Sequence, residues 1–123
     1  MDIKVGDIVK CQEKTVRIMQ SDGDSIQLAG CGWFEKNDPG IKLVESVKLP
    51  QLRDGDCVIV HDIPKIEKDY YGTSWTESMD DYVGKTVHIH NPHTSYWYGD
   101  VVTIGSWTFQ TYHLEKIDDY DIV

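Results

Sequence analysis

One internal repeat constrains the fold of this chain more than any other feature of its sequence. Short sequence motifs recur in the same order in both halves. Each motif lies at the start of, or within, an alternating apolar run typical of a β-strand. The matched segments are residues 6–7 and 55–56 (Gly-Asp), 14–18 and 85–89 (KTVRI and KTVHI), and 24–28 and 100–104 (DSIQL and DVVTI). The preserved order of these motifs predicts that a small β unit has been duplicated.

Turn residues divide the chain into short strands. Asp22-Gly23 predicts a hairpin, because Asp-Gly readily supplies the positive φ angles of tight turns. Pro50 interrupts strand pairing just before the second Gly-Asp pair, so we expect the boundary between the units there. The predicted units are residues 1–50 and residues 51–123, with a long first loop in the second unit at residues 61–81. Ser78 is expected to cap one helical turn in that loop, and no long amphipathic helix is predicted.

Two tryptophans lie at matched places in the two units. Trp33 precedes Phe34, and Trp107 stands two residues before Phe109. Large aromatic side chains at matched strand positions are most simply explained by core packing. We therefore expect Trp33 and Trp107 to be equivalent and largely buried, each closing its own unit.

The charge of the chain is unevenly distributed. The formal net charge is −9 at pH 7. Residues 1–53 carry eight acidic and eight basic side chains, so the whole acidic excess lies in residues 54–123. An acidic surface repels a phosphate backbone, so direct binding of nucleic acid is disfavoured and a basic protein partner is favoured. The acidic end at residues 118–121 is expected to fray.

The cysteines and the hydropathy pattern indicate a cytoplasmic protein. Three cysteines without a CxxC spacing favour neither a disulfide framework nor a zinc site. The first residues lack the basic-then-apolar pattern of a secretion signal. No apolar run approaches the roughly 20 residues needed to cross a membrane. We therefore expect a cytoplasmic chain that does not associate with membranes.

The second half resembles a known class of small β-barrels. It contains a Gly-Asp turn, a variable loop with Trp75, the run MDDYVGKT at residues 79–86, and a Trp107/Phe109 hairpin that closes on Leu114-Glu115. This combination is similar to SH3-like small β-barrel proteins of bacterial and phage origin. The resemblance implies an all-β chain of two tandem SH3-like small β-barrels with little helix. The Ala-Leu-Tyr-Asp-Tyr run and the paired tryptophans of peptide-binding SH3 domains are absent.

A pair of histidines raises the question of metal binding. His88 and His90 lie two residues apart, so along one strand both imidazoles project to the same face and suit a shared metal ion. That face is opposite Val87 and Ile89, which favours ordinary exposed histidines on a strand. We therefore predict no catalytic residue, no metal site and no cofactor, and a metal-dependent enzyme is the least favoured alternative.

Aromatic side chains of the second half give the main functional signal. Tyrosine and tryptophan offer a large contact area at low entropic cost and keep a polar group, which suits binding surfaces. Loops rarely bury many rings, so we expect those in the long loop to be presented to a partner beside acidic side chains. The predicted partner-binding residues are Tyr70, Tyr71, Trp75, Asp69, Glu67, Tyr96, Trp97 and Tyr98.

These features favour a non-catalytic protein that binds a basic or proline-containing surface of a partner protein through its second unit. The main alternative is an acidic mimic of nucleic acid, in which carboxylates replace phosphates and block a DNA- or RNA-binding enzyme, as in phage counter-defence. Mimicry favours carboxylates spread over the whole body, whereas residues 1–53 of this chain have no net charge.

Overall fold

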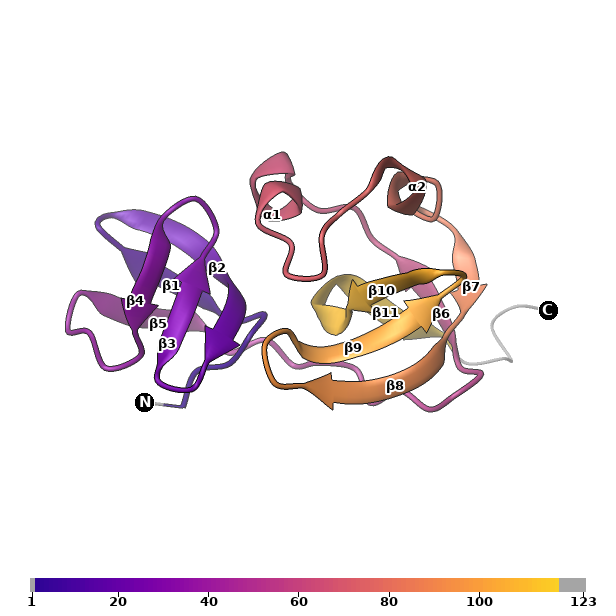
Figure 1. Ribbon diagram of the computed structural model, residues 1–123, viewed down its shortest axis with the longest axis horizontal. Coiled ribbons are helices and arrows are strands. Elements are labelled where there is room, and N and C mark those ends of the chain that lie inside the picture. Colours follow the sequence, from indigo (N-terminus) through magenta and orange to yellow (C-terminus); the bar gives the residue numbers. More distant parts are fainter. Residues whose placement is uncertain (1, 118–123) are drawn as a thin grey trace.

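Antiparallel β-strands are the main secondary structure of the protein, as the computed structural model shows for residues 2–117, the part of the chain that it describes (Figure 1). The first half forms one five-stranded sheet in the order β4-β3-β2-β1-β5. Its strands are β1 (Ile8–Cys11), β2 (Lys14–Asp22), β3 (Ser25–Leu28), β4 (Gly32–Glu35) and β5 (Ile41–Glu45). Gly23 lies at φ 59° between β2 and β3, which confirms the predicted hairpin.

The second half forms two three-stranded sheets, ordered β10-β9-β8 and β11-β6-β7. Its elements are β6 (Cys57–Val60), β7 (Thr86–His88), β8 (His90–Ser95), β9 (Gly99–Ile104), β10 (Trp107–Gln110), the 3-10 turn η1 (Thr111–His113) and β11 (Leu114–Ile117). The prediction of a mostly β chain with little helix is confirmed. Residues 118–121, for which fraying is predicted, lie outside the described residues.

Two short helices lie in the long connection between β6 and β7. They are α1 (Lys65–Asp69), which the sequence pattern did not reveal, and α2 (Glu77–Asp80), which confirms the predicted helical turn. The residue at the N-cap of α2 is Thr76, and not Ser78 as predicted. Within residues 2–117, no helix has the length and apolar character that crossing a membrane requires.

Inward-facing side chains build two buried clusters. One cluster lies within the first sheet and includes Ile18 and Ile26, and the other includes Phe109, which is fully buried. Met19 and Ala29 belong to the first half of the chain, yet they pack in the second cluster. The two halves therefore share a packed boundary, which increases the apolar area that each small unit removes from water.

The two repeated Gly-Asp segments form the same hydrogen-bonded turn. In the first, Gly6 lies at φ 99°, a left-handed conformation that favours glycine. The Gly6 N–H donates to the Ile18 carbonyl at 2.8 Å, and the Ile18 N–H donates to the Asp7 carbonyl at 2.9 Å. The Asp7 N–H donates to the Lys4 carbonyl at 3.1 Å, and the Lys4 N–H donates to Oδ2 of Asp7 at 3.0 Å.

All four of these bonds recur around Gly55, which lies at φ 89°. The Gly55 N–H donates to the Ile89 carbonyl at 2.8 Å, and the Ile89 N–H donates to the Asp56 carbonyl at 2.9 Å. The Asp56 N–H donates to the Arg53 carbonyl at 3.0 Å, and the Arg53 N–H donates to Oδ2 of Asp56 at 2.8 Å. The two copies of the Gly-Asp motif therefore adopt the same hydrogen-bonded turn.

The prediction of two equivalent, largely buried tryptophans is wrong. Trp33 is 45% exposed, because in β4 it pairs with Gln27 on the outer face of the sheet. The neighbouring Phe34 packs against the buried cluster instead. Trp107 is half-buried and packs at the edge of the second cluster, which contains Phe109. Successive side chains of a strand point to opposite faces, so the core accepts only one of two adjacent rings in β4.

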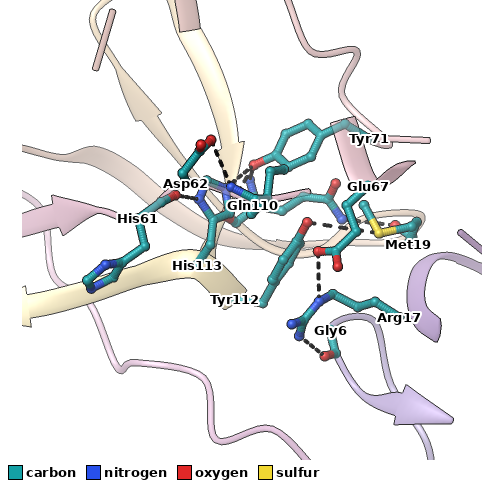
Figure 2. A network of polar contacts seen from close by, with 11 residues as sticks. Gly6, Arg17, Met19, His61, Asp62, Glu67, Tyr71, Gln110, Tyr112 and His113 are labelled. Carbon is teal, nitrogen blue, oxygen red and sulfur yellow. Dashed lines mark hydrogen bonds and ion pairs between the residues drawn. The ribbon is translucent and has the colours of Figure 1, made fainter. Parts of the chain in front are cut away.

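Gln110 is fully buried and joins three separate segments of the chain, one of which is β2 at Met19 (Figure 2). Its Nε2 donates to the Met19 carbonyl at 2.9 Å and to the Tyr98 carbonyl at 3.3 Å. Its Oε1 accepts a hydrogen bond from the Gly72 N–H at 3.0 Å. One amide thus links β2 of the first half, the turn after β8 and the long loop, and its polar atoms are satisfied without water.

His113 lies beside this amide and is held in its neutral form. Its Nδ1 is 2.9 Å from the His61 carbonyl, which only accepts hydrogen bonds, so Nδ1 carries the proton. Its Nε2 then accepts a hydrogen bond from the Tyr71 hydroxyl at 2.9 Å (Figure 2). Burial lowers the pKa of His113 from 6.5 to about 4, and burial raises the pKa of Tyr71, which keeps its hydroxyl a donor.

We predict that acid destabilises the fold through His113. Between pH 6.5 and about 4 the unfolded chain binds a proton at this position that the folded chain excludes. The free energy of unfolding should therefore fall with decreasing pH in this window, by roughly 2–3 kcal/mol between pH 7.5 and pH 4.5. Urea unfolding of the wild type and of His113→Gln at both pH values measures this contribution. His88→Gln, which changes an exposed histidine, is the control and should keep the wild-type dependence of the unfolding free energy on pH. If His88→Gln reduced this pH dependence as much as His113→Gln does, the dependence could not be assigned to His113.

Candidate functional site: an acidic aromatic face

Two of the predicted partner-binding residues, Tyr71 and Glu67, are buried, and the prediction for them is wrong. Tyr71 is 4% exposed, and its hydroxyl bonds inside the polar network of Figure 2. Glu67 is 8% exposed and accepts a hydrogen bond from Arg17 Nε at 2.9 Å. The Arg17 guanidinium also donates to the Gly6 carbonyl at 2.7 Å and lies 4.4 Å from the centre of the Tyr112 ring. This ion pair ties α1 to β2, so both side chains stabilise the fold.

The other predicted residues of the long loop serve mainly to hold it in place. Trp75 is half-buried against the second cluster, and its Nε1 donates to the Asp80 carboxylate at 2.9 Å. Tyr70 is partly buried against the same cluster. Asp69 is exposed and forms an ion pair with Lys65 at 3.2 Å, one turn earlier in α1. The loop therefore folds back over its sheet with Trp75 partly anchored, but it does not present a row of tyrosines.

The turn between β8 and β9 does present aromatic side chains to solvent. Tyr96 and Trp97, two of the predicted partner-binding residues, are 68% and 41% exposed. Tyr98 is half-buried, and its ring lies so close to Gly72 that a side chain there would collide with it. Gly72 is thus required by the close approach of the Tyr98 ring, and Tyr98 positions the turn.

Tyr96 and Trp97 meet Trp33 of the first half at the surface. The Trp33 and Trp97 rings are 6.5 Å apart at 87°, and the Tyr96 and Trp97 rings are 5.6 Å apart at 80°. Both are edge-to-face contacts, a favoured geometry for aromatic pairs. The Ser21 N–H donates to the Trp97 carbonyl at 2.8 Å, and the Tyr96 hydroxyl donates to the Asp22 carboxylate at 3.2 Å. Contacts with β2 therefore hold the turn of the second half against the first sheet.

The outer face of β2, β3 and β4 forms the floor of this site. The strand registers align two cross-strand rows, Gln20–Gln27–Trp33 and Asp22–Ser25–Glu35. Gln20 Nε2 donates to Gln27 Oε1 at 2.7 Å, which ties the middle of the floor. Sequence reasoning missed Trp33 and Glu35. The sequence signal that could have identified them is their alternation with Phe34 along a four-residue strand, which places them on the face opposite Phe34.

The floor is acidic as well as aromatic. Within residues 2–117, no lysine or arginine forms an ion pair with Asp22, Asp24 or Glu35. Lys36 lines a hollow beside the face together with Asp24 and Glu35. The hydrogen bond to Asp22 and the charges of Asp22 and Asp24 raise the pKa of Tyr96. The acidic aromatic face is defined here as Trp33, Tyr96, Trp97, Asp22, Asp24 and Glu35.

His88 and His90 are both exposed, but they do not lie in one strand as predicted. The buried Ile89 separates β7 from β8, and the two strands belong to different sheets. His88 Nδ1 lies 3.1 Å from the Gly55 carbonyl, and His90 Nδ1 lies 3.6 Å from the Asp54 carboxylate. Among the described residues, no three His, Cys, Asp or Glu side chains are grouped so that they suit a metal ion.

Comparisons with protein-family models, with curated protein sequences and with solved structures found no match. The function of this chain is therefore inferred from the geometry and the charge of the acidic aromatic face.

We predict that Trp33→Ala changes stability little, because this side chain is 45% exposed. The free energy of unfolding should stay within about 1 kcal/mol of the wild-type value. Phe109→Ala is the matched comparison, since it removes a fully buried ring and should cost about 3–5 kcal/mol. Urea unfolding followed by far-ultraviolet circular dichroism measures both. Equal losses in the two variants would show that Trp33 belongs to the core.

Proposed function

We propose that this protein is a non-catalytic interaction protein whose acidic aromatic face binds a basic segment of a partner protein. The observation that carries the proposal is the exposed cluster of Trp33, Tyr96 and Trp97 beside carboxylates that no described lysine or arginine pairs. Tryptophan and tyrosine dominate the energetics of many interfaces. Their ring faces attract lysine and arginine, and nearby carboxylates strengthen this preference.

The proposed binding surface does not include the long loop between β6 and β7. Both halves of the chain contribute to the face, Trp33 from β4 and Trp97 from the turn after β8. The face therefore depends on the packed boundary between the halves. A proline-containing segment fits the same aromatic side chains, provided that it also carries basic residues for Asp22, Asp24 and Glu35.

We also propose that the two halves are SH3-like units related by duplication. The shared register of the paired strands supports this: Val9 pairs with Val16 in β1 and β2, and Val58 pairs with Val87 in β6 and β7. The two Gly-Asp turns with the same four hydrogen bonds add further support. A 3-10 turn before the last strand, η1, and a long loop after the first strand of the second half fit the same architecture.

Nucleic-acid mimicry receives less support, because many carboxylates of the second half are already paired with cations. Lys68 pairs with Asp62 at 3.0 Å and with Asp80 at 3.1 Å, and Lys116 pairs with Asp56 at 3.4 Å. A mimic requires carboxylates that are free to meet the basic groups of an enzyme. A cytoplasmic location agrees with the proposed role and is part of the same proposal.

We predict that removing single groups of the face weakens binding of a labelled arginine-rich peptide. Trp97→Ala should reduce the affinity about tenfold, equivalent to about 1.4 kcal/mol, because it removes the central ring of the cluster. Asp22→Asn should reduce it less and should flatten its dependence on salt, because surface charge mainly steers encounter. Fluorescence anisotropy titrations at two salt concentrations measure both effects.

The control for these titrations is Asp81→Asn, which removes an exposed carboxylate just after α2, remote from the first sheet (Figure 1). It changes the net charge as much as Asp22→Asn does and should leave the affinity nearly unchanged. Equal weakening by both aspartate variants, with no effect of Trp97→Ala, would show that net charge alone attracts the peptide. The proposed site would then be abandoned.

A further inference from the structure

The open edge of the first sheet runs directly beside the acidic aromatic face. β4 is the last strand in the order β4-β3-β2-β1-β5, and within residues 2–117 no other strand pairs with its outer side. β4 carries both Trp33 and Glu35, which belong to the face. An exposed sheet edge offers a row of backbone donors and acceptors to which an extended segment can add.

The hydrogen-bond pattern shows which groups of β4 point outward. The Lys36 N–H donates to the Asp24 carbonyl at 2.7 Å, one residue pair beyond the pairing of Ser25 with Glu35. Bonded and non-bonded residue pairs alternate in an antiparallel ladder. Phe34 therefore bonds to β3, while Trp33 and Glu35 direct their backbone groups away from it.

Three of the four outward groups are available to a partner. The Glu35 carbonyl is taken by the Asp38 N–H at 3.1 Å. The other three groups, which are the N–H and C=O of Trp33 and the N–H of Glu35, form no backbone hydrogen bond with the described residues. Trp33 is therefore suited to form a doubly hydrogen-bonded pair with a residue of an added strand.

We propose, resting on the function proposed above, that the basic segment of the partner binds as an added β-strand along β4, with arginines at alternate positions. Residues that pair across strands project their side chains to the same face. The side chain opposite Trp33 thus lies over the acidic aromatic face, and the side chain two positions along lies against Glu35. Arginine suits both places, because its guanidinium stacks on a ring and also pairs with a carboxylate.

A second copy of this chain is a poorer occupant of the same edge. Pairing two β4 strands brings two faces together that each carry Asp22, Asp24 and Glu35, and like charges repel. A basic segment is instead attracted to these carboxylates. Sedimentation of the free protein as a dimer that Glu35→Pro dissociates would overturn the assignment of the edge to a partner.

The experiment compares two labelled peptides of the same composition, one with arginine and threonine alternating and one with all arginines in a single block. The alternating peptide should bind the full chain about tenfold more tightly, because only it places every arginine on one face of a strand. Equal affinities would overturn strand addition and leave the proposed function standing. Failure of both peptides to bind would overturn the proposed function itself.

Amide hydrogen exchange followed by NMR reads the backbone contact directly. The Trp33 and Glu35 amides should exchange at least about tenfold more slowly when the alternating peptide is bound, whereas the Phe34 amide is protected by β3 already in the free protein. Binding without this change would show a contact made by side chains alone, and strand addition would be wrong.

Two variants of Glu35 separate its charge from its backbone donor. Glu35→Gln removes only the charge, whereas Glu35→Pro also removes the outward N–H, a change that an edge strand tolerates on its solvent side. Circular dichroism establishes that both variants fold. Glu35→Pro should bind the alternating peptide about tenfold more weakly than Glu35→Gln does. Equal affinities of the two variants would overturn the proposed backbone pairing.

Discussion

The buried amide of Gln110 is the interaction on which the arrangement of the protein depends most. It bonds to Met19 in the first half, to Gly72 in the long loop and to Tyr98 in the turn after β8. Because an unsatisfied buried amide is costly, all three segments must reach their places together. The same side chain therefore fixes the boundary between the halves and the position of the turn that carries Trp97.

Aromatic side chains in this protein perform two different tasks. Tyr71 and Trp75 of the long loop pack against each other and against the second cluster, with their ring centres 5.1 Å apart. Tyr96 and Trp97 stay at the surface and meet a tryptophan of the first sheet. A loop of this length has few backbone bonds to a sheet, so buried rings and the Glu67–Arg17 ion pair hold it.

The acidic aromatic face follows from these constraints. Trp33 and Glu35 are exposed because the side chain between them in β4, Phe34, points toward the buried cluster. Tyr96 and Trp97 reach them because the turn after β8 is bonded to Ser21 and Asp22 of β2. The face and the free edge of β4 therefore lie side by side, because β4 contributes Trp33 and Glu35 to the face and is the last strand of its sheet.

The sequence alone determined the short strands and the Gly-Asp turns, because these follow from local turn chemistry and period-two patterns. It did not determine which rings are buried. Tyr71 and Glu67 are buried through contacts with η1 and β2, distant in sequence, and Trp33 is exposed through its pairing in the sheet. Only tertiary structure decided these placements, because burial depends on which segments meet and not on residue type.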